Sequence, residues 1–288
     1  MKLTIKEALR EASFTLKKAG ITDYIFEAAL LLAFSIKKDL VYVYTYSEKD
    51  ISEEVKAEYG RLVERRASGV PYHYLTGEKE FMGLSFRVTP KVLIPRPETE
   101  ILAEEAVKWV REQGGGPFNI LDLCTGSGVL AVTLARMFPR CSVWGADISS
   151  GALEIARENA RLHGVDKRAA FLQGDLWDSL NDSGEVNFSV IVSNPPYIPN
   201  SELSTLPREI SENEPVTALD GGSDGLHFYR RITAGLQNYL DSPGILALEV
   251  GIGQSEEVVS LVRQTGLFKE VKVVKDYRAV DRVVVGTS

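Results

Sequence analysis

The chain has 288 residues, 44% of them hydrophobic and 25% charged, a composition typical of a globular protein with room for one large domain and one small domain. Its formal net charge of −7 disfavours a nucleic-acid partner, because binding to phosphates needs a basic surface, and no apolar run reaches the about 20 residues of a membrane span. Two cysteines, three dispersed histidines and no Cys-x-x-Cys pair exclude a disulfide framework and a metal signature, so we expect a cytoplasmic protein without a metal.

The first part of the chain, residues 1–72, predicts a small helical domain. It begins without the apolar core of a signal peptide. Thr4 and Glu7 have the spacing of a capping box, which favours a helix that starts there and stops at Gly20. Further helices are expected over residues 23–33 and 52–69.

Residues 73–95 are expected to form a connector built around a β-hairpin. Gly77 and Gly83 interrupt short β-prone runs such as 84–88, as the turns of a hairpin do. The connector separates the helical region from a part of the chain with a different pattern.

Residues 96–288 alternate between strand and helix patterns, which predicts an α/β domain with a doubly wound, mostly parallel sheet. The last two strands follow each other without a helix, so one of them should be antiparallel. The strand candidates are 119–124, 142–147, 169–173, 188–193, 244–250, 268–274 and 282–286. The helix candidates are 98–112, 128–137, 151–163, 225–240 and 255–265.

A tight turn with the sequence Gly126-Ser127-Gly128 joins the first of these strands to the helix that follows it. The two glycines allow positive φ and a close approach of a ligand to the backbone, and N–H groups at the helix start face that ligand. Asp147 ends the next strand, where a carboxylate can hold ribose hydroxyls. The same spacing fits a dinucleotide fingerprint that ends at Ala131, so a nicotinamide cofactor stays open at this point.

Residues at further strand ends favour S-adenosyl-L-methionine over a nicotinamide cofactor. Asp122 precedes the glycine turn, where it can orient the turn and reach the amino group of a methionine portion. Asp175 follows the third strand and can accept from an adenine amino group, with Trp177 beside it as an apolar wall. Because open α/β sheets bind ligands at the carboxyl ends of their strands, these residues should meet in one site.

The sequence Asn194-Pro195-Pro196-Tyr197 follows the fourth strand and points to the chemistry of the site. Proline has no N–H and pushes the residue before it into extended geometry, so the carbonyls of Asn194 and Pro195 can stay free of local pairing. Together with the Asn194 side-chain oxygen they can converge on one –NH2 group, with the Tyr197 ring beside it. Such a clamp suits methylation of a planar, weakly nucleophilic nitrogen, and hydride transfer would not need it.

The stretch from Gly221 to Gly225 matches the Gly-x-Ser-x-Gly elbow of hydrolases, and His227 lies close by in the sequence. An elbow needs a buried strand directly before it, and residues 214–220 make a poor strand. We therefore expect Ser223 or Asp224 to cap the helix that follows.

At these residues the sequence resembles the release factor glutamine methyltransferase (PrmC/HemK) family, and the resemblance covers nearly the whole chain. The segment Leu93-Ile-Pro-Arg-Pro-Glu-Thr-Glu100 is the most discriminating motif, since the motif at 194–197 is shared with adenine-N6 DNA methyltransferases. One departure is Cys124, where many members have glycine. The other matching segments are 74–77, 80–84, 122–128, 194–198, 221–226 and 228–230.

The resemblance implies a seven-stranded, Rossmann-like methyltransferase domain over residues 96–288 and a helical domain that recognises the substrate protein. It implies methylation of N5 of the glutamine in the Gly-Gly-Gln motif of class 1 peptide-chain release factors, which modulates translation termination, with S-adenosyl-L-homocysteine as product. With the strand-end residues above, the expected cofactor contacts are Asp122, Cys124, Thr125, Gly126, Ser127, Gly128, Asp147, Asp175, Trp177 and Asn194. The expected catalytic and substrate-binding residues are Asn194, Pro195, Pro196 and Tyr197, with Arg96 and Glu98 as further substrate contacts.

Two other functions stay open. The clamp could serve methylation of an adenine or guanine amino group in RNA or DNA, and the glycine turn could serve a nicotinamide-dependent dehydrogenase or a non-catalytic nucleotide-binding protein. The acidic charge and the N-terminal helices favour a protein substrate, with no membrane partner. Nothing in the sequence indicates an obligate dimer, so we expect a monomer.

Overall fold

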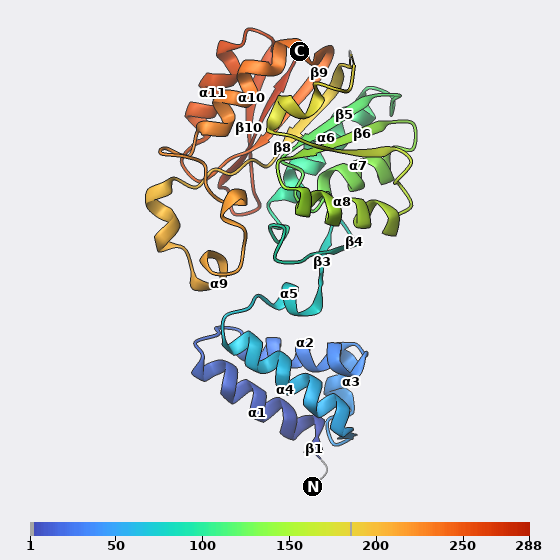
Figure 1. The fold of residues 1–288 in the computed structure, drawn as a ribbon, viewed down its shortest axis with the longest axis vertical. Helices are drawn as coiled ribbons and strands as arrows, with labels where there is room; N and C mark the ends of the chain where they lie inside the picture. Colours follow the sequence, from blue (N-terminus) through green and yellow to red (C-terminus); the bar gives the residue numbers. More distant parts are fainter. Residues whose placement is uncertain (1–2, 185) are drawn as a thin grey trace. The chain divides into compact units, whose positions relative to one another are not determined.

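The computed structural model describes residues 3–184 and 186–288 (Figure 1). The chain divides into two compact units, which we call the helical unit (Met1–Glu78 with Pro207–Asn213) and the sheet unit (Lys79–Leu206 with Glu214–Ser288). Among the described residues, no helix is both long and apolar enough to cross a membrane.

The helical unit has a small core between three helices, and the predicted capping box is confirmed. The Thr4 hydroxyl accepts from the Glu7 backbone N–H at 3.3 Å, and the Glu7 carboxylate accepts from the Thr4 backbone N–H at 2.9 Å. Two short helices were not predicted, and one of them depends on Asp39, whose carboxylate caps the helix by accepting from Tyr42 N. The elements are β1 (Leu3–Thr4), α1 (Ile5–Lys18), α2 (Tyr24–Ile36), α3 (Leu40–Thr45), β2 (Asp50–Ile51), α4 (Glu53–Ala67) and α5 (Tyr72–Thr76).

The segment Pro207–Asn213 packs in the helical unit although both of its flanks belong to the sheet unit. Arg66 on α4 is only 4% exposed, and its guanidinium binds the carboxylates of Glu27 on α2 and Glu209 in the segment. Asn213 at the end of the segment also donates to a backbone carbonyl of the helical unit. A single buried cation therefore joins parts of the chain that are distant in sequence.

Seven strands of the sheet unit form one sheet in the order β10-β11-β9-β8-β5-β6-β7. The five strands from β9 to β7 are parallel, and β11 runs antiparallel to both of its neighbours, so the predicted sheet and its antiparallel strand are confirmed. Every residue of β8 is buried, as expected of a parallel strand covered on both faces. The strands are β5 (Asn119–Leu123), β6 (Ser142–Asp147), β7 (Ala169–Gln173), β8 (Phe188–Ser193), β9 (Leu240–Glu249), β10 (Glu270–Lys275) and β11 (Asp281–Thr287).

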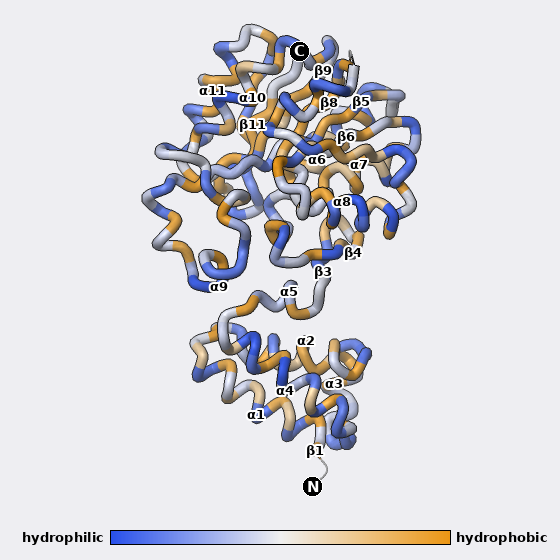
Figure 2. Tube along the Cα trace, viewed as in Figure 1, coloured by the Kyte–Doolittle hydropathy of each residue, from blue (hydrophilic) through white to orange (hydrophobic). Residues whose placement is uncertain are grey.

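Helices cover both faces of this sheet (Figure 1). Apolar strand residues are enclosed between the two helix layers, whereas hydrophilic residues lie on the outward faces of the helices (Figure 2). One layer contains α6 (Thr99–Glu112), α7 (Val129–Met137) and α8 (Ser150–Leu162). The other contains η1 (Leu176–Leu180), α10 (His227–Gly235), η4 (Leu236–Asn238) and α11 (Ser255–Gln264).

The predicted hairpin is present, formed by β3 (Glu78–Phe81) and β4 (Leu84–Arg87) with Gly83 at positive φ in its turn. Between β8 and α10 the chain forms an isolated bridge between Ile198 and Asp220 and three short helical turns, none of which was predicted. These are η2 (Asn200–Thr205), α9 (Arg208–Ser211) and η3 (Val216–Ala218).

The predicted cap of α10 is wrong. The N-cap residue is Leu226, which has no side-chain oxygen to accept a hydrogen bond. Asp224 instead accepts from the Leu226 backbone N–H at 3.1 Å and pairs with Arg230 on the helix. The carboxylate thus fixes the loop before the helix and the first turn of the helix at once.

Candidate functional site

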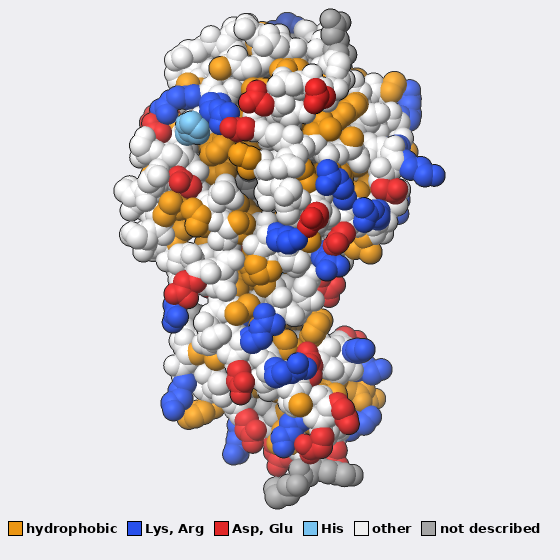
Figure 3. Space-filling view, in the orientation of Figure 1, with side chains coloured by type: hydrophobic (Ala, Val, Ile, Leu, Met, Phe, Trp, Pro, Cys, Tyr) orange, Lys and Arg blue, Asp and Glu red, His pale blue; other side chains and the backbone are white. Residues whose placement is uncertain are grey.

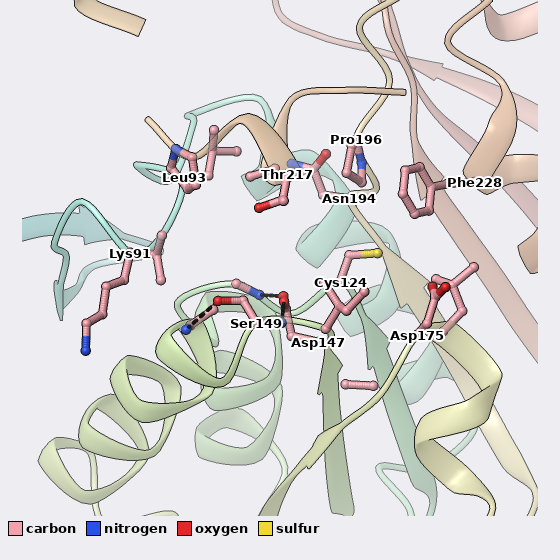
Figure 4. A pocket seen from close by; sticks show the side chains of 18 of the residues that line it. Lys91, Leu93, Cys124, Asp147, Ser149, Asp175, Asn194, Pro196, Thr217 and Phe228 are labelled. Atoms are coloured by element: carbon pink, nitrogen blue, oxygen red, sulfur yellow. Dashed lines mark hydrogen bonds between the residues drawn. The ribbon is translucent and has the colours of Figure 1, made fainter. Parts of the chain in front are cut away.

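A cavity lies at the carboxyl ends of β5, β6, β7 and β8 (Figure 4). Five of the predicted cofactor contacts line it, and each strand end contributes at least one: Cys124, Gly126, Asp147, Asp175 and Asn194. Pro196 lines it as well. The structure therefore brings the ends of four strands together around one hollow.

The glycine turn and Asp147 are held to each other by hydrogen bonds. One Asp147 carboxylate oxygen accepts from Gly126 N and the other from Ser149 N, both at 2.9 Å. Burial raises the pKa of Asp147, although these hydrogen bonds favour its ionised form. At Gly128 φ is +81°, and a Cβ there would lie 3.0 Å from the Ala156 side chain, so the close packing of turn and helix needs glycine.

Four predicted cofactor contacts in or near the glycine turn do not line the cavity: Asp122, Thr125, Ser127 and Gly128. Asp122 is fully buried, and its Oδ2 accepts from the Thr125 hydroxyl at 2.6 Å and from Ala131 N at 3.2 Å. Its Oδ1 has no hydrogen-bond partner among the described residues. Burial raises the pKa of Asp122 to about 7. The buried carboxyl group thus fixes the conformation of the turn by accepting hydrogen bonds from residues on either side of it.

Asp175 and Trp177 were expected to act together, but the structure separates them. Asp175 lines the cavity and pairs with Arg231 at 2.9 Å. Trp177 does not line it, because its indole N–H donates to the Arg231 carbonyl and its ring stacks on Tyr239 at 4.9 Å. Leu176 lines the cavity instead, as does Phe228 (labelled in Figure 4).

Asn194 is fixed by a chain of buried hydrogen bonds. Its Nδ2 donates to the Thr99 hydroxyl at 3.1 Å, and that hydroxyl donates to Glu249 Oε2 at 2.6 Å. Tyr197 OH lies 3.5 Å from Glu249 Oε1. Glu249 is 2% exposed, and burial raises its pKa to about 7. With Nδ2 engaged, the amide oxygen of Asn194 is the end that has no hydrogen-bond partner among the described residues.

The first two carbonyls after β8 are open acceptors among the described residues. No described residue donates a hydrogen bond to the carbonyl of Asn194 or Pro195. Pro195 and Tyr197 themselves do not line the cavity. Burial and the nearby Glu249 raise the pKa of Tyr197, so its hydroxyl stays protonated at neutral pH.

The two predicted substrate contacts outside this motif, Arg96 and Glu98, do not line the cavity. Arg96 pairs with the buried carboxylate of Glu214 at 2.6 Å. Sequence reasoning missed Thr99 and Glu249. The sequence contained a signal for each of them: Thr99 lies in the 93–100 motif, and Glu249 is an acidic residue at the end of a buried apolar strand.

The charges around the cavity favour hydroxyl groups and cations over phosphates. Its charged lining residues are Asp147, Asp175 and Lys91, and Lys91 points away from the hollow to Glu154, at 2.6 Å (Figure 4). A pyrophosphate would meet two carboxylates there, with the Gly126 N–H already used. Among the described residues, no cluster of side chains could hold a metal ion.

The hydrolase interpretation of residues 221–225 finds no support in the structure. Ser223 and His227 are exposed, and no hydrogen bond joins them. The residues before Ser223 form η3 and an isolated bridge at Asp220, so the buried strand that an elbow requires is not there.

Two family models match the chain. The PrmC N-terminal domain matches residues 7–77, and the methyltransferase small domain matches residues 103–212. The first match falls on the helical unit, and the second covers the first part of the sheet unit together with residues 207–212 of the helical unit.

Similar proteins include the release factor glutamine methyltransferase of Geobacter sulfurreducens, 40% identical over 98% of this chain and 96% of its own length. Another is that of Moorella thermoacetica, 38% identical over 97% of each chain. Among solved structures, the hMettl16 catalytic domain in complex with MAT2A 3'UTR hairpin 1 has a TM-score of 0.56, covering 78% of this chain and 80% of its own. At 16% identity that likeness shows the methyltransferase fold alone.

Proposed function

The chain belongs to the release factor glutamine methyltransferase family, and we propose on this basis that it methylates a glutamine side chain of peptide-chain release factors. The acceptor would be N5 of the glutamine in the Gly-Gly-Gln motif of class 1 release factors. The observation that carries the proposal is the Asn194 amide, which lines the strand-end cavity with its oxygen free and its nitrogen engaged.

The cavity lining fits S-adenosyl-L-methionine as the methyl donor. Asp147 and Asp175 can accept hydrogen bonds from ribose hydroxyls and from an amino group, and Leu176 and Phe228 give apolar walls for a flat base. When bound, this cofactor supplies a methyl group on a cationic sulfur, which an anionic cavity favours. Asp122 would hold the glycine turn in place without contacting the cofactor. After methyl transfer, the cofactor product would be S-adenosyl-L-homocysteine.

The chain's own acceptors would make the glutamine nitrogen reactive. An amide nitrogen is a weak nucleophile because its lone pair is delocalised into the carbonyl, and it gains positive charge as its new bond to carbon forms. Asn194 Oδ1 and the carbonyl of Pro195, which lies between the lining residues Asn194 and Pro196 and accepts no hydrogen bond from a described residue, would accept from the two N–H bonds and stabilise that charge. Preorganised groups of this kind contribute about 3–4 kcal/mol each. As the glutamine nitrogen forms its new bond to carbon, that carbon would leave the donor sulfur, and the surplus proton on nitrogen would pass to water.

Tyr197 would complete the clamp without acting as a base. Its hydroxyl stays protonated and is directed to Glu249, so only its ring would be available to the glutamine amide. An aromatic face beside a planar amide restrains its orientation and interacts favourably with positive charge.

We propose that residues 1–72 form the domain that recognises the substrate, residues 73–95 the connector and residues 96–288 the methyltransferase domain. The surface of the helical unit is consistent with a protein substrate. On the face in Figure 3, basic and acidic side chains are interspersed over this unit, unlike the basic surface of a nucleic-acid binder. Exposed apolar side chains available for protein contact include Phe14, Ile25, Phe26 and Val41. We propose that the protein acts as a monomer in the cytoplasm.

Transfer of labelled methyl groups tests this function. S-adenosyl-L-methionine labelled in the methyl group is offered with a class 1 release factor, the same factor with the motif glutamine changed to alanine, tRNA, rRNA and DNA. We expect label only in the unchanged release factor. Label in a nucleic acid but not in the release factor would reject the proposal.

Asn194→Ala tests the clamp. We expect kcat to fall about 10²–10³-fold, the effect of removing one preorganised group from a transition-state site. Asn200→Ala is the matched control, because Asn200 is exposed and lies outside the cavity lining. Both variants should keep the far-ultraviolet circular dichroism of the wild type. Turnover of Asn194→Ala equal to that of the control would exclude the acceptor role.

A further inference from the structure

Resting on the proposed function, we infer that Thr99 and Glu249 are positioning residues that determine which end of the Asn194 amide faces the substrate nitrogen. The two ends of an asparagine amide have nearly the same shape but opposite hydrogen-bonding character. Only the oxygen can accept from an incoming –NH2 group. If the amide were reversed, two donors would face each other and the clamp would lose its acceptor.

The three side chains come from separate parts of the fold and meet at one buried point. Asn194 follows β8, Thr99 begins α6 and Glu249 ends β9, which lies next to β8 in the sheet. Thr99 is 3% exposed and Glu249 is 2% exposed. We call this hydrogen-bonded chain, from Asn194 through Thr99 to Glu249, the relay. Water has little access to it, so its protons must be shared among these three side chains.

The direction of the relay follows from the number of protons available. An ionised Glu249 has no proton to give, so it accepts the one hydroxyl proton of Thr99 at 2.6 Å. The Thr99 oxygen is then left only with acceptor capacity, which it uses for Asn194 Nδ2 at 3.1 Å. A carboxylate two hydrogen bonds away thus holds the Asn194 oxygen toward the cavity.

Protonation of Glu249 would reverse this direction. The carboxylic acid would donate to the Thr99 oxygen, which would free the Thr99 hydroxyl proton to donate to Asn194 Oδ1, and Nδ2 would turn to the cavity. Arg282 on β11 favours the ionised form, and Glu98 before α6 opposes it. Tyr197 OH lies at the other carboxylate oxygen, and Tyr229 on α10 donates to the Glu249 backbone carbonyl. Burial raises the pKa of Glu249 to about 7, so the reversal would occur near neutral pH.

Substitutions at Thr99 separate a positioning role from a packing role. Thr99→Val keeps the shape of the side chain and removes the relay, whereas Thr99→Ser keeps the hydroxyl. We expect kcat for the release factor to fall about 10–100-fold in Thr99→Val, as for outer partners that orient a metal ligand, and to stay within about twofold in Thr99→Ser. The dissociation constant of S-adenosyl-L-methionine, measured by calorimetry, should stay unchanged in both.

Thr133→Val is the matched control. Thr133 on α7 is equally buried, at 1% exposure, and its hydroxyl has no hydrogen-bond partner among the described residues. Its kcat should equal that of the wild type. A kcat of Thr99→Val equal to that of Thr133→Val would overturn the inference, and so would an equal loss in Thr99→Ser and Thr99→Val.

The pH profile gives a readout that a structural role would not change, and it does not depend on the Thr99 variants. We expect wild-type kcat at saturating substrates to fall as pH decreases through about 7, and Glu249→Gln to have a lower kcat without this acidic limb. The same limb in wild type and Glu249→Gln would overturn the inference. Failure of the proposed function is a separate result, since the wild type itself would then leave the release factor unlabelled.

Discussion

Asp122→Asn should make the protein more stable, by an amount that increases with pH. The carboxyl group is fully buried beneath the glycine turn, and burial raises its pKa from an ordinary 3.8 to about 7. The folded state therefore holds this proton more tightly than the unfolded state does. Stability from this group is complete below pH 3.8 and is lost as pH rises through about 7.

The magnitude follows from the shift of roughly 3 pKa units, which at about 1.4 kcal/mol per unit corresponds to about 4 kcal/mol. Asparagine keeps an acceptor for the Thr125 hydroxyl and Ala131 N–H but does not ionise. The difference in free energy of unfolding between Asp122→Asn and wild type should therefore grow by up to about 4 kcal/mol from pH 4 to pH 8.5. Glu249 titrates in both proteins, so its contribution cancels.

Urea denaturation followed by circular dichroism at several pH values measures this difference. A difference that stays constant over the whole range would refute the reasoning, because it would mean that Asp122 does not ionise within the folded protein. A difference that shrinks as pH rises would show that the ionised carboxylate is stabilised, contrary to the effect of burial.

Two further predictions concern stability. Gly128→Ala should lower the free energy of unfolding by about 1–3 kcal/mol, because alanine is strained at φ +81° and its Cβ would press on Ala156; an unchanged denaturation midpoint would contradict this. Arg66→Met should lower it by about 3 kcal/mol, because it leaves Glu27 without its buried cation, whereas Arg61→Met, at an exposed ion pair, should change it by less than about 1 kcal/mol. Equal denaturation curves for the two arginine variants would show that burial of the Arg66 pair is not important.

The sheet could be predicted from the sequence because its strands are short apolar runs with clear ends. The bounds of Ser142–Asp147, Ala169–Gln173 and Phe188–Ser193 agree with the structure to the residue. Residues 198–220 could not be predicted, because their short helical turns depend on distant partners, as Glu209 depends on Arg66. A local pattern carries no information about such contacts.

The sequence predicted where the site lies better than it predicted which side chains face the cavity. Strand ends indicate where ligand-type residues gather, but packing decides which of them face the cavity. Trp177 turns away because Gly235 leaves room for its indole, where a Cβ would lie 2.2 Å from Nε1. Thr99 and Glu249 are separated by 150 positions, so no spacing motif joins them.

The inclusion of Pro207–Asn213 in the helical unit means that the backbone passes from one unit to the other three times, after Glu78, after Leu206 and after Asn213. Neither unit is thus a single continuous stretch of polypeptide. A peptide ending at Glu78 would lack Glu209 and leave Arg66 with half of its carboxylate partners. A truncated or chimeric protein that contains the helical unit must therefore also include the seven residues Pro207–Asn213, joined to the N-terminal helices.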